Sequence, residues 1–91
     1  MIELIDEKRQ VLATYKTTGP RNLAAAIRER EKLAEDDPPV ECMVWIDRVA
    51  MLPVDILMLQ RLLAKQSSRK NLTQIYESYL ISFAEGRDYF R

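Results

Sequence analysis

Few side chains in this sequence have the chemistry of catalysis. The chain contains no histidine, which excludes imidazole acid–base catalysis, Ser-His-Asp triads and HExxH zinc sites. Its one thiol, at Cys42, cannot form an internal disulfide or build a structural zinc site alone. The two glycines, at 19 and 86, allow neither a GxGxxG fingerprint nor a phosphate-binding loop. We therefore predict no catalytic residue, no metal site and no cofactor.

Paired carboxylates and the thiol are the remaining chemical candidates. On a helix, Glu3 would share a face with Glu7, and Glu31 with Glu35, and two close carboxylates can divide the roles of acid and base. Both pairs stand among lysines and arginines, which is typical of a solvated surface. Cys42 falls in the first turn of a predicted helix, where a thiolate can be activated. We favour the alternative, that Cys42 is a small buried hydrophobe.

Two groups of side chains suit the recognition of another macromolecule. Basic residues at every fourth position form a stripe. They could bind phosphates, or they could simply stabilise a helix through attraction to the negative, C-terminal end of its dipole. The C-terminal tail combines aromatic and arginine side chains, which dominate binding hot spots but can also fold back onto a core. The predicted partner-binding residues are Arg61, Lys65, Arg69 and Lys70 in the stripe, and Arg87, Tyr89, Phe90 and Arg91 in the tail.

The secondary-structure elements that position these side chains are predicted from the glycines and prolines, which interrupt helices. Glycine and proline occur at Gly19-Pro20, Pro38-Pro39, Pro53 and Gly86, and they divide the chain into pieces of helical length. Apolar residues recur at spacings of three and four within the pieces. Asn71, three residues before Gln74, resembles a capping box. We predict an all-α domain, a compact bundle of about five short helices at residues 2–17, 20–36, 39–52, 53–66 and 71–85 in one domain, 1–91.

The middle of the chain, residues 38–63, holds most of the strongly apolar side chains. Residues 39–52 and 53–66 are apolar on almost every side, which predicts two core helices joined at Pro53 and surrounded by the others. The apolar surface of this segment can exceed what one chain covers, so we expect dimerisation to complete the bundle. Five charged residues interrupt the segment, so it is not expected to span a membrane: Glu41, Asp47, Arg48, Asp55 and Arg61.

The amino-acid composition excludes further classes of function. The 14 lysines and arginines balance 14 aspartates and glutamates, so no overall field attracts nucleic acid or anionic lipid. A lone cysteine and a charged N-terminus without an apolar signal region predict a cytoplasmic protein. The leading hypothesis is a non-enzymatic interaction protein, expected as a homodimer, that binds and regulates a larger protein, of the kind found in bacteria, phages and plasmids. The alternative is a small DNA-binding regulator that uses residues 61–70 in a helix-turn-helix.

Overall fold

A computed structural model describes residues 1–65 and 69–89 of the chain. The described part is an α+β fold, in which one antiparallel sheet with strand order β2-β1-β3-β4 is covered by helices. The elements in chain order are β1 (Ile2–Asp6), β2 (Val11–Tyr15), α1 (Pro20–Ala34), β3 (Cys42–Ile46), β4 (Val49–Ala50), α2 (Pro53–Lys65) and α3 (Arg69–Tyr89).

The predicted all-α bundle is therefore wrong in two of its five pieces. Residues 2–17 form the β1–β2 hairpin, and residues 39–52 contain the β3–β4 hairpin. In β1, Ile2 and Leu4 are buried while Glu3 and Ile5 are partly exposed, the period of two that a half-buried strand requires. In β3, the side chains alternate in the same way, with the buried set on the face that α1 covers. β-Branched and aromatic residues favour this pleated surface over a helix.

The β1–β2 turn is held by the side chain of Asp6. Its Oδ1 accepts hydrogen bonds from the backbone N–H groups of Lys8, at 2.9 Å, and Gln10, at 2.8 Å. The Asp6 N–H also donates to the Gln10 carbonyl oxygen at 3.0 Å. Aspartate favours turns because its carboxylate bonds to the backbone a few residues further on. Arg9 takes a left-handed conformation here, with φ 66°, and its guanidinium lies 5.7 Å from the Trp45 ring centroid.

The β3–β4 turn explains two of the five charges that interrupt the apolar segment. Asp47 and Arg48 connect the strands, and both have positive φ, 48° and 69°. Two consecutive left-handed residues give a two-residue hairpin the right-handed twist of its strands. Asp47 also contacts the Met1 ammonium group at 2.6 Å and the Thr18 hydroxyl at 3.3 Å. The segment predicted as one apolar helix is thus divided by a turn without glycine, asparagine or proline.

The other three predicted helices are present with shifted ends. Pro20 and Pro53 each open a helix, as a proline in the first turn should, because its missing N–H would have no partner there. α3 begins at Arg69, so Asn71 lies inside the helix instead of capping it. Gly86 does not end α3, which continues to Tyr89. The cap and the stop predicted at these two residues are both wrong.

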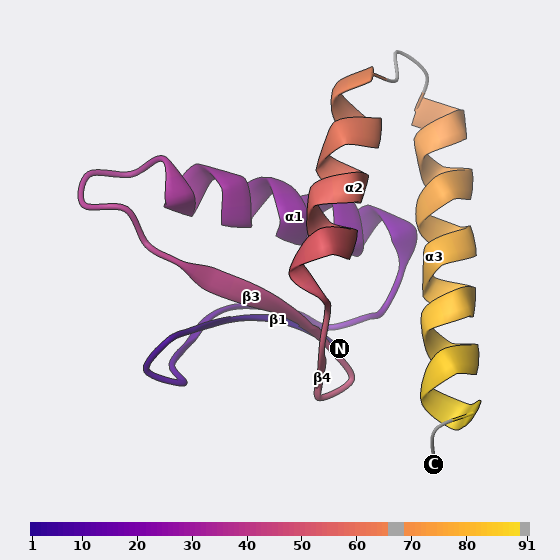
Figure 1. Ribbon diagram of the computed structural model, residues 1–91, viewed down its shortest axis with the longest axis horizontal. Coiled ribbons are helices and arrows are strands. Elements are labelled where there is room, and N and C mark those ends of the chain that lie inside the picture. Colours follow the sequence, from indigo (N-terminus) through magenta and orange to yellow (C-terminus); the bar gives the residue numbers. More distant parts are fainter. Residues whose placement is uncertain (66–68, 90–91) are drawn as a thin grey trace.

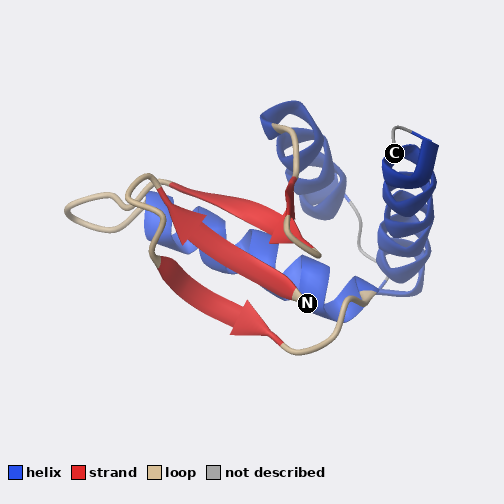
Figure 2. Ribbon diagram, turned by 90° about the horizontal axis from the view of Figure 1, so that it is seen from below, coloured by secondary structure: helices blue, strands red, loops and turns tan. Residues whose placement is uncertain are grey.

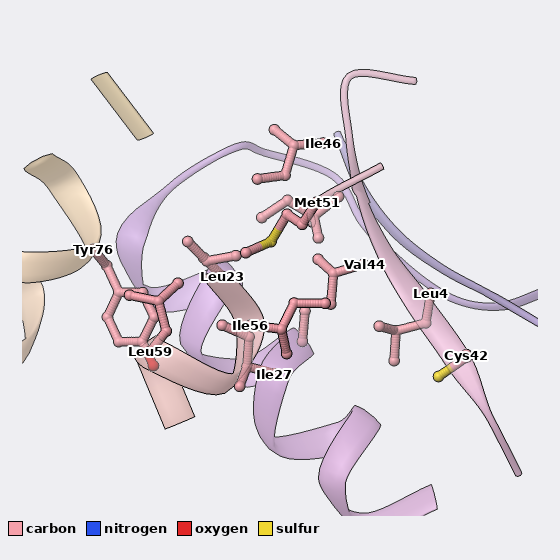
Figure 3. Packing of buried hydrophobic residues seen from close by; sticks show 12 residues of the cluster. Leu4, Leu23, Ile27, Cys42, Val44, Ile46, Met51, Ile56, Leu59 and Tyr76 are labelled. Atoms are coloured by element: carbon pink, nitrogen blue, oxygen red, sulfur yellow. The ribbon is translucent and has the colours of Figure 1, made fainter. Parts of the chain in front are cut away.

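The core lies between the sheet and the helices. α1 crosses the face of the sheet formed by β1 and β3, and α3 packs mainly against α1 (Figures 1 and 2). Leu23 and Ile27 of α1 lie between Val44 of β3 and the first turns of α2 (Figure 3). Burial of each such side chain contributes about 1.5–3 kcal/mol by transfer from water. The fully buried side chains from all of these elements include Ile2, Leu4, Ile46, Met51, Ile56, Leu59 and Tyr76.

One edge of the sheet is irregular. The register of β1 against β2 shifts between Leu4 and Ile5, so that Leu4 faces Ala13, Ile5 faces Val11 and Leu12 has no opposite residue. An extra residue of this kind bends an edge strand and increases its twist. At the other edge, β4 is only two residues long.

Candidate interaction surface

One face of α2 carries a stripe of apolar and basic side chains. The residues recur at spacings of three and four, so they share one side of the helix. They line a hollow of about 400 Å³ on the surface. We call this set the α2 stripe, and it consists of Val54, Leu57, Met58, Arg61, Leu62 and Lys65.

The apolar members of the α2 stripe are unusually exposed for a helix that also contributes to the core. Val54 is 69% exposed, Leu57 47% and Met58 46%, while Ile56 and Leu59 on the opposite side are 1% exposed. Apolar side chains gathered on an open face indicate an interaction site more often than scattered ones do. The expectation that this whole segment is core is therefore wrong for its outer side.

The basic stripe predicted at residues 61–70 is placed in part. Arg61 and Lys65 are exposed on the same face of α2 as Val54 and Met58. Arg69 and Lys70 open α3, but their side chains lie outside what the structure describes. In the predicted tail, Phe90 and Arg91 lie outside the described residues. The side chains of Arg87 and Tyr89 also lie outside what the structure describes.

A second hollow, of about 480 Å³, lies where α2 faces α3. Asp55, Met58, Tyr79 and Phe83 are among the residues that line it, and Met58 also belongs to the α2 stripe. The Tyr79 hydroxyl donates to Oδ2 of Asp55 at 3.5 Å. Burial, the charge of Asp55 and this hydrogen bond raise the pKa of Tyr79. The carboxylate is thus engaged on the side of α2 that faces α3.

The arrangement of α2 and α3 bears on the predicted helix-turn-helix. The two helices run side by side in opposite directions (Figure 1). The helices of a DNA-binding helix-turn-helix instead cross at about 90–120°. The geometry of this pair is that of a helical hairpin, with the α2 stripe on its outer side.

Cys42 is a buried strand residue and not a residue of a helix N-terminus. It lies in β3 with 5% of its surface exposed, which confirms that it is a buried hydrophobe. Its carbonyl oxygen accepts a hydrogen bond from Nε of Arg30 at 2.9 Å, which ties α1 to the sheet. Burial raises the pKa of the Cys42 thiol, although the Arg30 charge opposes that shift. The thiol is therefore protonated at neutral pH and shielded from solvent.

The two predicted carboxylate pairs differ in the structure. Glu31 in α1 and Glu35 at its C-terminal cap lie one helical turn apart, and both are exposed, as expected for a solvated surface. Glu3 lies in β1 and Glu7 in the turn that follows, so they share no helical face. Glu7 instead neighbours Glu41, and hydrogen bonding with that carboxyl and its charge raise the pKa of Glu7. Both residues of this pair are exposed, so water screens them. Among the described residues, no three His, Cys, Asp or Glu side chains come together as a potential metal site.

Comparisons with known proteins identify no relative of this chain. Within the described part of the chain, no helix has both the length and the apolar character needed to cross a membrane. No family model, no curated protein and no solved structure matches this chain.

Proposed function

We propose that this chain is a non-enzymatic interaction protein, which binds and regulates a larger protein through the α2 stripe. The observation that carries the proposal is the exposure of Val54, Leu57 and Met58 side by side on one helix face. An isolated domain gains nothing from apolar side chains in water, whereas covering them with a partner releases the free energy that drives most protein association. The fold supplies a rigid base, because the opposite side of α2 is anchored in the core by Ile56 and Leu59.

The chemistry of the other surfaces supports an interaction role over catalysis. The thiol is buried, and the exposed carboxylate pair of Glu7 and Glu41 stands in open water, where an acid–base pair gains little from its surroundings. The mixed character of the stripe also favours protein as the partner. A phosphate backbone is recognised by cations and hydrogen-bond donors, and it would leave Val54 and Leu57 in water.

Comparative affinity purification from the host tests the proposal. The test variant replaces Val54, Leu57 and Met58 with serine, and Ile81→Ser serves as a matched control because Ile81 is 61% exposed on α3, outside the α2 stripe. All four positions are exposed, so both variants should remain folded by circular dichroism. We expect the wild type and I81S to retain a partner that the triple variant loses. Identical recovery by all three proteins would refute the role of the stripe, whatever the partner is.

A further inference from the structure

The α2 stripe changes in character along the helix, from exposed apolar residues to cations that flank the half-buried Leu62. Val54, Leu57 and Met58 occupy the N-terminal half, and Arg61 and Lys65 follow along the same side toward the C-terminal end. The hollow beside the stripe has no acidic side chain in its lining. The surface therefore presents an apolar area followed by positive charge, at a spacing of about one helical turn.

The two cations have no counter-charge within the described part of the protein. Neither Arg61 nor Lys65 forms an ion pair there. Asp55, the one acidic residue of α2, faces α3 and accepts the Tyr79 hydroxyl. Lys65 stands in the last turn, where the helix dipole favours a cation, but Arg61 stands a full turn earlier. Arg61 is therefore an exposed cation that is free to pair with an acid from a partner.

A second copy of the chain suits this surface poorly. Two parallel stripes placed face to face would bring four cations together, from Arg61 and Lys65 of each copy, and two antiparallel stripes would place each pair of cations against the apolar end of the other copy; neither arrangement supplies an acid from the stripe. The exposed apolar area of the α2 stripe is also small for a stable dimer. The exposed parts of Val54, Leu57 and Met58 amount to on the order of 300 Å², whereas an interface of standard size takes about 800 Å² from each partner.

We infer that the α2 stripe binds an amphipathic helix of another protein, whose apolar side chains cover Val54, Leu57 and Met58 and whose carboxylates reach Arg61 and Lys65. This inference rests on the proposed function and specifies the chemistry of the partner. A helix suits the surface because rows of side chains spaced by three and four interlock between two helices. The apolar contacts supply most of the affinity, and the carboxylates determine the direction in which the partner helix lies.

Two designed peptides test the inference by fluorescence anisotropy. Both are helical, about 18 residues long, with the same row of leucines at spacings of three and four, and they differ only at one end of that row, which carries glutamates in one peptide and lysines in the other. The glutamate peptide should bind at least about tenfold more tightly than the lysine peptide, because each cation then meets attraction instead of repulsion. The preference should shrink as salt concentration rises.

Charge reversal separates the stripe from general electrostatics. R61E/K65E should invert the preference, so that the lysine peptide binds more tightly. The matched control R21E/R28E reverses two exposed cations of α1 and should leave the preference unchanged. The triple serine variant at 54, 57 and 58 should bind neither peptide.

Several results would overturn the inference. Equal binding of the two peptides, or a preference that R61E/K65E does not change, would exclude charge recognition at the stripe. If sedimentation shows that the wild type is a dimer and the triple serine variant is a monomer, the occupant of the stripe is a second copy of the chain. Duplex DNA that binds with steep salt dependence and is lost in R61E/K65E would make nucleic acid the ligand. If neither peptide binds while the triple serine variant still loses its host partner, this inference fails and the proposed function stands.

Discussion

The hydroxyl of Tyr76 offers a sharp test of the packing. Tyr76 is 1% exposed, and its hydroxyl has no hydrogen-bond partner among the residues that the structure describes. A buried polar group without a partner costs about 1–3 kcal/mol relative to its hydrated state. Removing it in Y76F should therefore stabilise the protein, although loss of the tyrosine hydroxyl is usually destabilising.

The magnitude follows from two opposing contributions. Phenylalanine avoids the desolvation cost, but it leaves a void of about 10 Å³, which costs roughly 0.2 kcal/mol at the usual penalty per unit of cavity volume. We expect Y76F to raise the free energy of unfolding by about 1 kcal/mol, or the melting temperature by about 4–8 °C for a domain of this size.

Urea denaturation followed by far-UV circular dichroism measures this change. The denaturant dependence should be the same in both proteins, so that the midpoint alone reports stability. Y79F is the matched control, because the Tyr79 hydroxyl does have a partner in Asp55. Y79F should lower the free energy of unfolding by about 0.5–1 kcal/mol. A loss of stability in Y76F as large as that in Y79F would refute the reasoning, because it would show that the Tyr76 hydroxyl has a partner.

Three further predictions concern the turn, the pH dependence and the thiol. R48G should stabilise the protein by about 0.5–1 kcal/mol in thermal melts, because glycine adopts the positive φ of this exposed position without strain; an unchanged or lower melting temperature would contradict this. The raised pKa of Tyr79 means that the unfolded chain loses this proton first, above its usual pKa of 10.0, so the contribution of Tyr79 to stability is intact below pH 10 and is lost above it. Y79F should retain on the order of 1 kcal/mol more of its neutral-pH stability at pH 11 than the wild type does, and parallel pH profiles would refute that assignment. Cys42 should react with a thiol reagent at least about a hundredfold more slowly in the folded protein than in urea, and comparable rates would show that β3 is accessible.

The sequence predicts the helices of this protein much better than its strands, for a physical reason. Pro20 and Pro53 mark helix starts through a backbone constraint that does not depend on the rest of the fold. A five-residue strand shows only two or three alternations, and the apolar residues Ile2 and Ile5 of β1 also match a helical spacing. The choice between the two depends on pairing with β3, which lies some forty residues away in the sequence.

The second hairpin could not be predicted because its turn lacks glycine, asparagine and proline. Asp47 and Arg48 adopt left-handed conformations that glycine or asparagine would have signalled, so β3 and β4 appear in the sequence as one continuous apolar run. The first hairpin did carry a signal. Asp6, whose carboxylate bonds to the N–H groups of Lys8 and Gln10, stands between two runs rich in β-branched residues.

The candidate surface was predictable in its charges and not in its apolar part. A spacing of four places Arg61 and Lys65 on one face of any helix, and both are exposed. Val54 and Leu57 look like core residues because α2 is apolar on nearly every side. Which side faces water is decided by where α1 and α3 lie, and no local pattern contains that information.

The unpaired Leu12 in β2 also affects how copies of the chain meet at high concentration. An open sheet edge is a template on which identical molecules can add their own strands and grow into fibres. The shifted register bends β2 out of the straight line that such stacking needs, and the shortness of β4 limits growth from the opposite edge. Deletion of Leu12, which would restore an even register, is therefore expected to make this edge a nucleus for aggregation.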